Sequence, residues 1–145
     1  MRPLRILVVD DTSEIRTLLS RVLTGQGYDV LEACDGQEAL STCRGVNGDV
    51  DLLLTDIKMP RVDGVELATT LTASYPSIRV LYISGQCDTD EIQAQVSERG
   101  FGFLSKPFMP DMLIRRVEQV LTPARRPVQA AKSNSSIADR DERLS

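Results

Sequence analysis

Acidic, basic and hydroxyl side chains end or follow four of the apolar runs in this 145-residue sequence. Asp10 and Asp11 come directly after the first run and Asp56 after the third, while Ser84 and Lys106 close the last two. Three carboxylates brought together would repel and raise one another's pKa unless a cation lay between them. Oxygen ligands in a chain without histidine suit Mg²⁺, which prefers few protein carboxylates and a phosphate partner. These residues predict a Mg²⁺ site.

The same residues could accept a phosphoryl group. Lys106 would supply positive charge, and the Ser84 hydroxyl a donor, for phosphoryl oxygens. Carboxylates are nucleophiles that form aspartyl phosphates, which makes Asp56 the expected acceptor. Taken singly, each residue has a simpler reading: Asp11 or Thr12 as a helix N-cap, and Ser84 as a turn residue. Taken together at the ends of four predicted strands, they favour one site.

Five short apolar runs rich in β-branched residues predict strands that are covered on both faces. They lie at 4–9, 28–33, 50–55, 80–83 and 101–104. The clearest helix follows Thr12 and Ser13, which are good N-caps, and ends at Gly25 or Gly27. Its predicted apolar stripe consists of Ile15, Leu18, Leu19, Val22 and Leu23. Further helices are expected around 39–43, from near Asp63 to before Pro76, at 88–98 and at 110–121.

Strand and helix alternate five times, which predicts parallel strands joined by right-handed crossovers. The expected fold class is α/β: a doubly wound, flavodoxin-like sheet of five parallel strands in the order 2-1-3-4-5, with helices on both faces. The first and third strands flank the point where the strand order reverses. The carboxylates of Asp10, Asp11 and Asp56 should therefore converge there.

Length and composition predict one domain over residues 1–122 and a disordered C-terminal tail over 123–145, rich in Pro, Ala, Arg, Ser and Asn. Residues 1–122 carry 12 basic and 18 acidic side chains, a net charge of −6, which argues against binding to nucleic acid. Three widely spaced cysteines argue against a disulfide framework or a zinc site. The apolar run at 6–9 is too short for a signal peptide or a membrane span, so we expect a cytoplasmic protein.

In combination these motifs resemble the response-regulator receiver family of two-component signalling. The matching pieces span residues 4–121. They are Ile6-Leu7-Val8-Val9-Asp10-Asp11, Asp56-Ile57-Lys58-Met59-Pro60 with Asp63-Gly64, Ile83-Ser84-Gly85 and Lys106-Pro107-Phe108.

The resemblance implies a role for each matching residue. It makes Asp56 the phosphoacceptor and a metal ligand, Asp11 a direct Mg²⁺ ligand, and Asp10 the holder of a metal-bound water. Lys58 would lend its backbone carbonyl to the metal. Ser84 and Lys106 would bind phosphoryl oxygens, and the Lys106–Pro107 peptide bond would be cis.

The resemblance also implies a switch in which Ser84 moves toward the phosphate and Phe103 rotates inward, changing the surface of the fourth helix and fifth strand. Serine replaces the more usual threonine at position 84, and phenylalanine the more usual tyrosine at position 103. Phe103 cannot form the tyrosine hydrogen bond, and an ordinary place in the core is the alternative reading of this residue.

The expected function is phosphoacceptance from a phosphohistidine of a histidine kinase or a histidine phosphotransfer protein, with a downstream protein reading the result. The chain would not be a conventional enzyme: it would catalyse its own phosphorylation and slow autodephosphorylation. It would act as a single-domain regulator, a phosphorelay intermediate or a receiver excised from a hybrid histidine kinase. A docking-only receiver is an alternative. A haloacid-dehalogenase-like phosphatase would need an aspartate where Lys58 stands. In an FMN-binding module, Asp10 and Asp11 would repel the phosphate of FMN.

Overall fold

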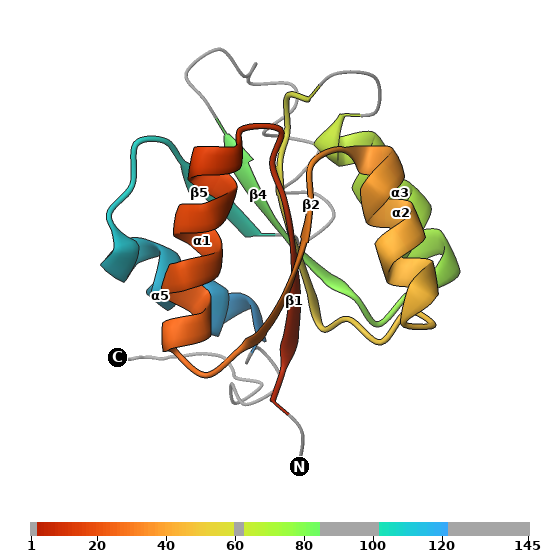
Figure 1. Cartoon of the computed structure of the whole chain (residues 1–145), viewed down its shortest axis with the longest axis horizontal. Helices are drawn as coiled ribbons and strands as arrows, with labels where there is room; N and C mark the ends of the chain where they lie inside the picture. Colours follow the sequence, from red (N-terminus) through yellow and green to blue (C-terminus); the bar gives the residue numbers. More distant parts are fainter. Residues whose placement is uncertain (1–2, 60–62, 85–101, 122–145) are drawn as a thin grey trace, which may run out of the picture.

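The computed structural model describes residues 3–59, 63–84 and 102–121. Its helices and strands, shown in Figure 1, are β1 (Arg5–Val9), α1 (Ser13–Gly25), β2 (Asp29–Ala33), α2 (Gly36–Gly45), β3 (Leu52–Asp56), α3 (Gly64–Ser74), β4 (Arg79–Ser84), β5 (Gly102–Ser105) and α5 (Pro110–Leu121). The helix expected at 88–98 lies outside the described residues, and so does the tail at 123–145.

The five strands form one sheet in the order β2-β1-β3-β4-β5, and each neighbouring pair is parallel, which confirms the predicted fold. The register aligns the carboxyl ends of the strands. Val9, the last residue of β1, pairs with Ala33 on one side and Thr55 on the other. Side chains that follow these positions therefore meet at one edge of the sheet, which we call the carboxyl rim.

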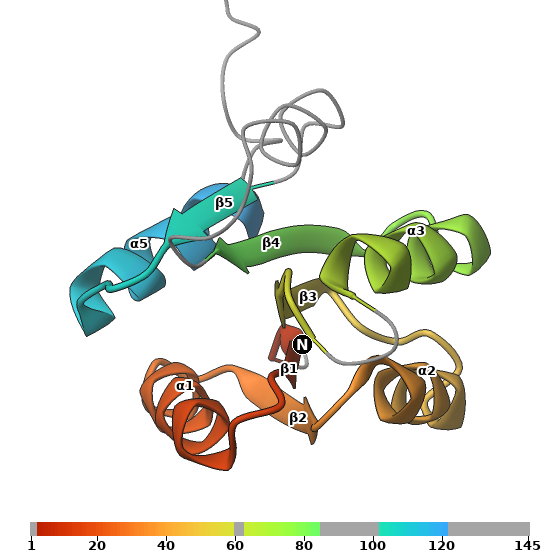
Figure 2. The same ribbon diagram turned by 90° about the horizontal axis from the view of Figure 1, so that it is seen from above.

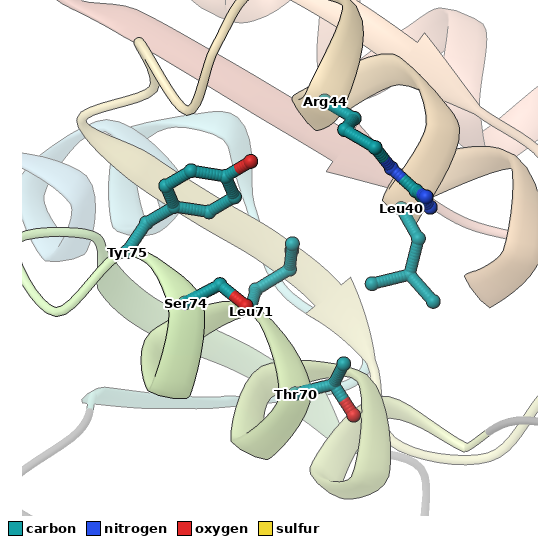
Figure 3. Close-up of a pocket in the computed structure, with 6 residues that line it drawn as sticks. All are labelled: Leu40, Arg44, Thr70, Leu71, Ser74 and Tyr75. Atoms are coloured by element: carbon teal, nitrogen blue, oxygen red, sulfur yellow. The ribbon is translucent and has the colours of Figure 1, made fainter.

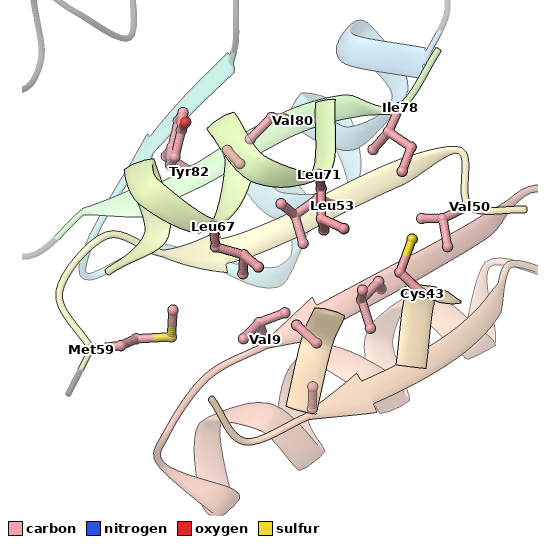
Figure 4. Close-up of a cluster of buried hydrophobic side chains, with 14 of the residues drawn as sticks. Val9, Cys43, Val50, Leu53, Met59, Leu67, Leu71, Ile78, Val80 and Tyr82 are labelled. Carbon is pink, nitrogen blue, oxygen red and sulfur yellow. The ribbon is translucent and has the colours of Figure 1, made fainter. Parts of the chain in front are cut away.

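The helices lie in two layers, seen from above in Figure 2: α1 and α5 cover one face of the sheet, and α2 and α3 cover the other. Each layer has its own apolar core. Figure 4 shows the core under α2 and α3, where Leu53 of the sheet, Leu67 of α3 and Cys43 of α2 are fully buried. The core under α1 and α5 includes Leu19 and Leu113. Burial on both faces explains why the strands are almost continuously apolar.

Helix ends follow the expected chemistry with one difference. Gly25 ends α1, and Gly27 beyond it has a φ of 93°, a left-handed conformation that glycine adopts without a steric penalty. Asp63 caps α3 by accepting a hydrogen bond from the Glu66 amide. Thr12 occupies the N-cap position of α1, but its side chain makes no cap hydrogen bond.

The apolar stripe predicted for α1 is wrong at one position. Leu19 is 1% exposed, whereas Leu18 is 52% exposed. At 100° per residue Leu18 lies at the edge of the stripe that faces the sheet, beyond the arc that the sheet covers. An apolar side chain on the surface of a helix needs no core partner, so spacing alone overestimates the width of the buried face.

Candidate functional site

The carboxyl rim gathers the predicted acidic residues. Asp10 directly follows β1, and Asp56 is the last residue of β3. Carboxylate oxygens of Asp10, Asp11 and Asp56 lie within 4.8 Å of one another. Asp10 and Asp56 are buried and Asp11 is exposed, so the group opens to solvent on the side of Asp11.

Lys106 supplies a cation to this group. It follows β5, and its Nζ donates a hydrogen bond of 3.0 Å to Asp56 Oδ2. Burial alone would lower the pKa of Lys106, but the hydrogen bond and charge of Asp56, together with the charges of Asp10 and Asp11, more than offset burial and raise that pKa. Lys106 is therefore a permanent positive charge at neutral pH. The Lys106–Pro107 peptide bond is cis, as the resemblance implied.

Only one oxygen of the Asp10 carboxylate accepts a hydrogen bond among the described residues. Its Oδ1 accepts a hydrogen bond of 2.8 Å from the Thr12 amide, while its Oδ2 is buried without a hydrogen-bond partner among the described residues. Burial raises the pKa of Asp10, and the Asp56 charge adds to this effect, although the Thr12 amide opposes it. A hard divalent cation would replace the lost solvation of a buried carboxylate oxygen that belongs to a group of three carboxylates. The residues present therefore fit Mg²⁺.

The carbonyl of Asp56 lies in a crowded place at the end of β3. Thr55 Oγ1 donates a hydrogen bond of 2.9 Å to the Asp56 carbonyl. A Cβ atom on Gly64, the first residue of α3, would lie 2.1 Å from that same oxygen. Only glycine lets the start of α3 approach the backbone of Asp56 this closely. The motif Asp63-Gly64 follows β3 in the sequence, but the residue types alone do not indicate this contact.

The remaining predicted residues lie where the topology places them. Ser84 ends β4 and pairs in register with Ser105, so its backbone reaches the rim. Lys58 is exposed two residues after Asp56. Phe103 lies on β5 and is half-buried against the core under α2 and α3, which agrees with both of its readings. Its carbonyl accepts a hydrogen bond from Arg116 of α5.

A pocket of about 320 Å³ lies between α2 and α3 (Figure 3). It is lined by Leu40, Arg44, Thr70, Leu71, Ser74 and Tyr75. The residues from α3 lie in its C-terminal half or, for Tyr75, directly after it, whereas Gly64 at the other end of α3 contacts Asp56. The pocket therefore takes no part in the acidic site.

A doubly wound parallel sheet with an acidic group and a lysine on its carboxyl rim is the arrangement that the resemblance to receiver domains implied. The family model of the response regulator receiver domain matches residues 6–118, and the chain belongs to this family. It is a receiver domain of two-component systems.

Three relatives illustrate the range of proteins that share this domain. The chain is 34% identical over 116 residues to the sensor kinase CckA of Brucella abortus, covering 80% of this chain and 12% of the kinase. It is 36% identical over 134 residues to the transcriptional regulatory protein PrrA of Mycobacterium leprae, covering 92% of this chain and 56% of that protein. The structure of the chemotaxis protein CheY4 of Vibrio cholerae matches with a TM-score of 0.73 at 30% identity, over 82% of this chain and 99% of CheY4.

The chain thus spans about half of one curated relative and about an eighth of another. Because a transcriptional regulator is among the relatives, the expected lack of nucleic-acid binding stays a prediction. Within the part of the chain that the structure describes, no helix is long and apolar enough to cross a membrane.

Proposed function

We propose that this chain is a phosphoacceptor whose nucleophile is Asp56. The observation that carries the proposal is the 3.0 Å contact between Lys106 Nζ and Asp56 Oδ2, within a group of three carboxylates at the carboxyl rim. The lysine holds one oxygen of Asp56 in place, which leaves the other free to attack. Positioning and neutralisation of charge are most of what phosphoryl transfer requires.

In the transfer, a carboxylate oxygen of Asp56 forms a bond to the phosphorus of a phosphohistidine while the phosphorus–nitrogen bond breaks. The electron pair of that bond stays on the imidazole nitrogen, which takes its proton from solvent. Lys106 then neutralises charge on the phosphoryl oxygens, and the Ser84 hydroxyl donates a hydrogen bond to them. Slow attack by water on the phosphorus would break its bond to the Asp56 oxygen, release inorganic phosphate and return the carboxylate.

Mg²⁺ would be held by the carboxylates of Asp10, Asp11 and Asp56 and by the backbone carbonyl of Lys58. The bound ion would neutralise charge on the acceptor and on the phosphoryl oxygens. The Oδ2 atom of Asp10 supports this assignment, because it is a buried acceptor without a hydrogen-bond partner among the described residues, on a carboxylate that lies close to the other two.

The partners follow from the chemistry. The donor is a histidine kinase or a histidine phosphotransfer protein, since this chain contains no histidine of its own. Phosphorylation shifts a pre-existing equilibrium at the surface of the fourth helix and β5 through Ser84 and Phe103, and a downstream protein reads the change. We assign residues 1–122 to the receiver, and the tail predicted for 123–145 lies outside the described residues. The similarity to the sensor kinase CckA supports a hybrid kinase as one context, beside a single-domain regulator.

The decisive experiment is phosphorylation by a small-molecule phosphodonor with Mg²⁺, followed by intact-mass measurement. Wild type should gain the mass of one phosphoryl group, stable in acid and labile in base, and Asp56→Asn should gain none. Asp49→Asn, a change at the opposite end of the sheet, is the matched control and should behave as wild type. An equal gain in Asp56→Asn would refute the assignment, and no gain in wild type would favour the docking-only alternative.

A further inference from the structure

Arg16 connects the acidic site to the end of β2. It lies in the first turns of α1, and its Nη1 donates a hydrogen bond of 2.7 Å to the Asp10 carbonyl. Its Nε lies 3.3 Å from Glu32 Oε1 on β2. The side chain of Arg16 is 19% exposed, so the guanidinium is largely covered. One planar group thus binds two elements at once, as arginine does better than lysine.

The backbone of Asp10 is held on both sides. Its amide donates to the carbonyl of Ala33, the last residue of β2, at 3.2 Å, and its carbonyl accepts from Arg16. That carbonyl belongs to the planar peptide that joins Asp10 to Asp11. The orientation of this peptide determines where both carboxylate side chains begin. Arg16 therefore acts on two of the three acidic residues without touching either carboxylate.

We propose that Arg16 is a positioning residue that holds the Asp10–Asp11 peptide in the orientation required for metal binding, with Glu32 as its anchor. This inference rests on the proposed function, because it concerns the same acidic site. Mutation of residues that hydrogen-bond to metal ligands and orient them typically weakens metal affinity by about 10-fold to 100-fold.

Whether Arg16→Gln weakens or strengthens Mg²⁺ binding distinguishes a positioning role from a purely electrostatic one. A cation close to a metal site opposes binding of a second cation, so a purely electrostatic Arg16 would weaken Mg²⁺ binding, and Arg16→Gln would strengthen it. A positioning Arg16 gives the opposite result. Glutamine is too short to reach both Asp10 and Glu32, and loss of the contact would loosen the peptide.

The experiment measures Mg²⁺ affinity from the rise in Tm with Mg²⁺ concentration, and the exchange rate of the Thr12 amide in metal-free protein by NMR. The Thr12 amide reports the geometry of Asp10 directly, because it donates to Asp10 Oδ1. Arg16→Gln should weaken Mg²⁺ affinity about 10-fold and speed exchange at Thr12. Glu32→Gln should have a smaller effect in the same direction, and Arg16→Lys should restore part of the affinity.

Arg21→Gln is the matched control, since it removes the same charge from an exposed position of α1, and its Mg²⁺ affinity should equal that of wild type. Equal or tighter Mg²⁺ binding by Arg16→Gln would overturn the inference. The inference would also fail if Arg16→Gln lowered the Tm of the metal-free protein but left Mg²⁺ affinity and the exchange rate of the Thr12 amide unchanged. If wild type itself bound no Mg²⁺, the proposed function would fail. Faster Thr12 exchange in metal-free Arg16→Gln would still support the positioning contact.

Discussion

Asp10 and Asp56 have the same side chain in different surroundings. Asp56 has the ammonium group of Lys106 at 3.0 Å, whereas Asp10 has one backbone amide and one buried oxygen without a partner among the described residues. Without a bound cation, the negative charge therefore costs more at Asp10 than at Asp56. The buried charge of Asp10 therefore destabilises the metal-free protein, and a bound cation would offset this cost.

Asp10→Asn should therefore raise the Tm of the metal-free protein at neutral pH and weaken its stabilisation by Mg²⁺. Because burial and the Asp56 charge raise the pKa of Asp10 above its usual value of 3.8, the folded state binds the proton more tightly than the unfolded state does. The penalty of the charged form is fully present above the folded-state pKa and disappears as pH falls toward 3.8. The gain from Asp10→Asn should shrink over the same range.

Thermal unfolding in a chelator from pH 4 to pH 7.5 measures this effect. Asp11→Asn is the control, because it removes the neighbouring charge from an exposed position and should change the Tm less. A Tm gain for Asp10→Asn that stays constant across the pH range would contradict the assignment of the gain to the buried charge.

Residue type reveals only part of this site. Four residues could be predicted from type and position alone: Asp10, Asp11, Asp56 and Lys106. Several carboxylates and an ammonium group at the ends of neighbouring strands favour a site that binds a cation and a phosphoryl group. Gly64 and Arg16 act through contacts with backbone oxygens, and nothing in a glycine after an aspartate, or in an arginine on a helix, indicates such a contact. Those contacts depend on how α1 and α3 lie against the rim, which follows from packing rather than from residue type.

At the scale of elements, the sequence predicted the strands and four of the helices to within a few residues because both core layers impose a clear pattern. The start of α3 was predictable from Asp63, whose side chain caps the helix. The width of the buried face of α1 was not, because Leu18 fits the helical spacing yet lies outside the arc that the sheet covers. Spacing reports the period of a helix, while neighbouring elements decide how much of its surface is covered.

Gly64→Ala tests how closely α3 must approach Asp56. The new Cβ would lie 2.1 Å from the Asp56 carbonyl oxygen, so the start of α3 or the end of β3 has to move. We expect a loss of about 1–3 kcal/mol in the free energy of unfolding, as for other overpacked sites. We also expect slower phosphorylation of Asp56, because the same movement displaces its carboxylate. Chemical denaturation and the rate of phosphoryl incorporation measure the two effects.

Gly45→Ala is the matched control, because Gly45 ends α2 and a Cβ there would meet nothing within 4 Å. This variant should change the free energy of unfolding by no more than about 1 kcal/mol and leave phosphorylation unchanged. If both variants behaved alike, the proximity of Gly64 to Asp56 would have no functional consequence.

At the scale of the whole molecule, one sheet is shared by two separate core layers. Leu53 faces the layer under α2 and α3, whereas its neighbours Leu52 and Leu54 face the layer under α1 and α5. The central strands β1, β3 and β4 each contribute side chains to both layers. Loss of packing on either face weakens the same five strands, and with them the rim that aligns Asp10 and Asp56.

We therefore expect the described fold to unfold in a single transition, whichever layer is damaged. Leu67→Ala, in the α2 and α3 layer, and Leu19→Ala, in the α1 and α5 layer, should each lower the free energy of unfolding by about 2–5 kcal/mol. Urea denaturation followed by circular dichroism should show one transition with an unchanged slope in both variants. Leu18→Ala removes the same atoms from the adjacent, exposed position and should cost no more than about 0.5 kcal/mol. Two resolved transitions in either core variant would mean that the layers fold independently and that the rim depends on only one of them.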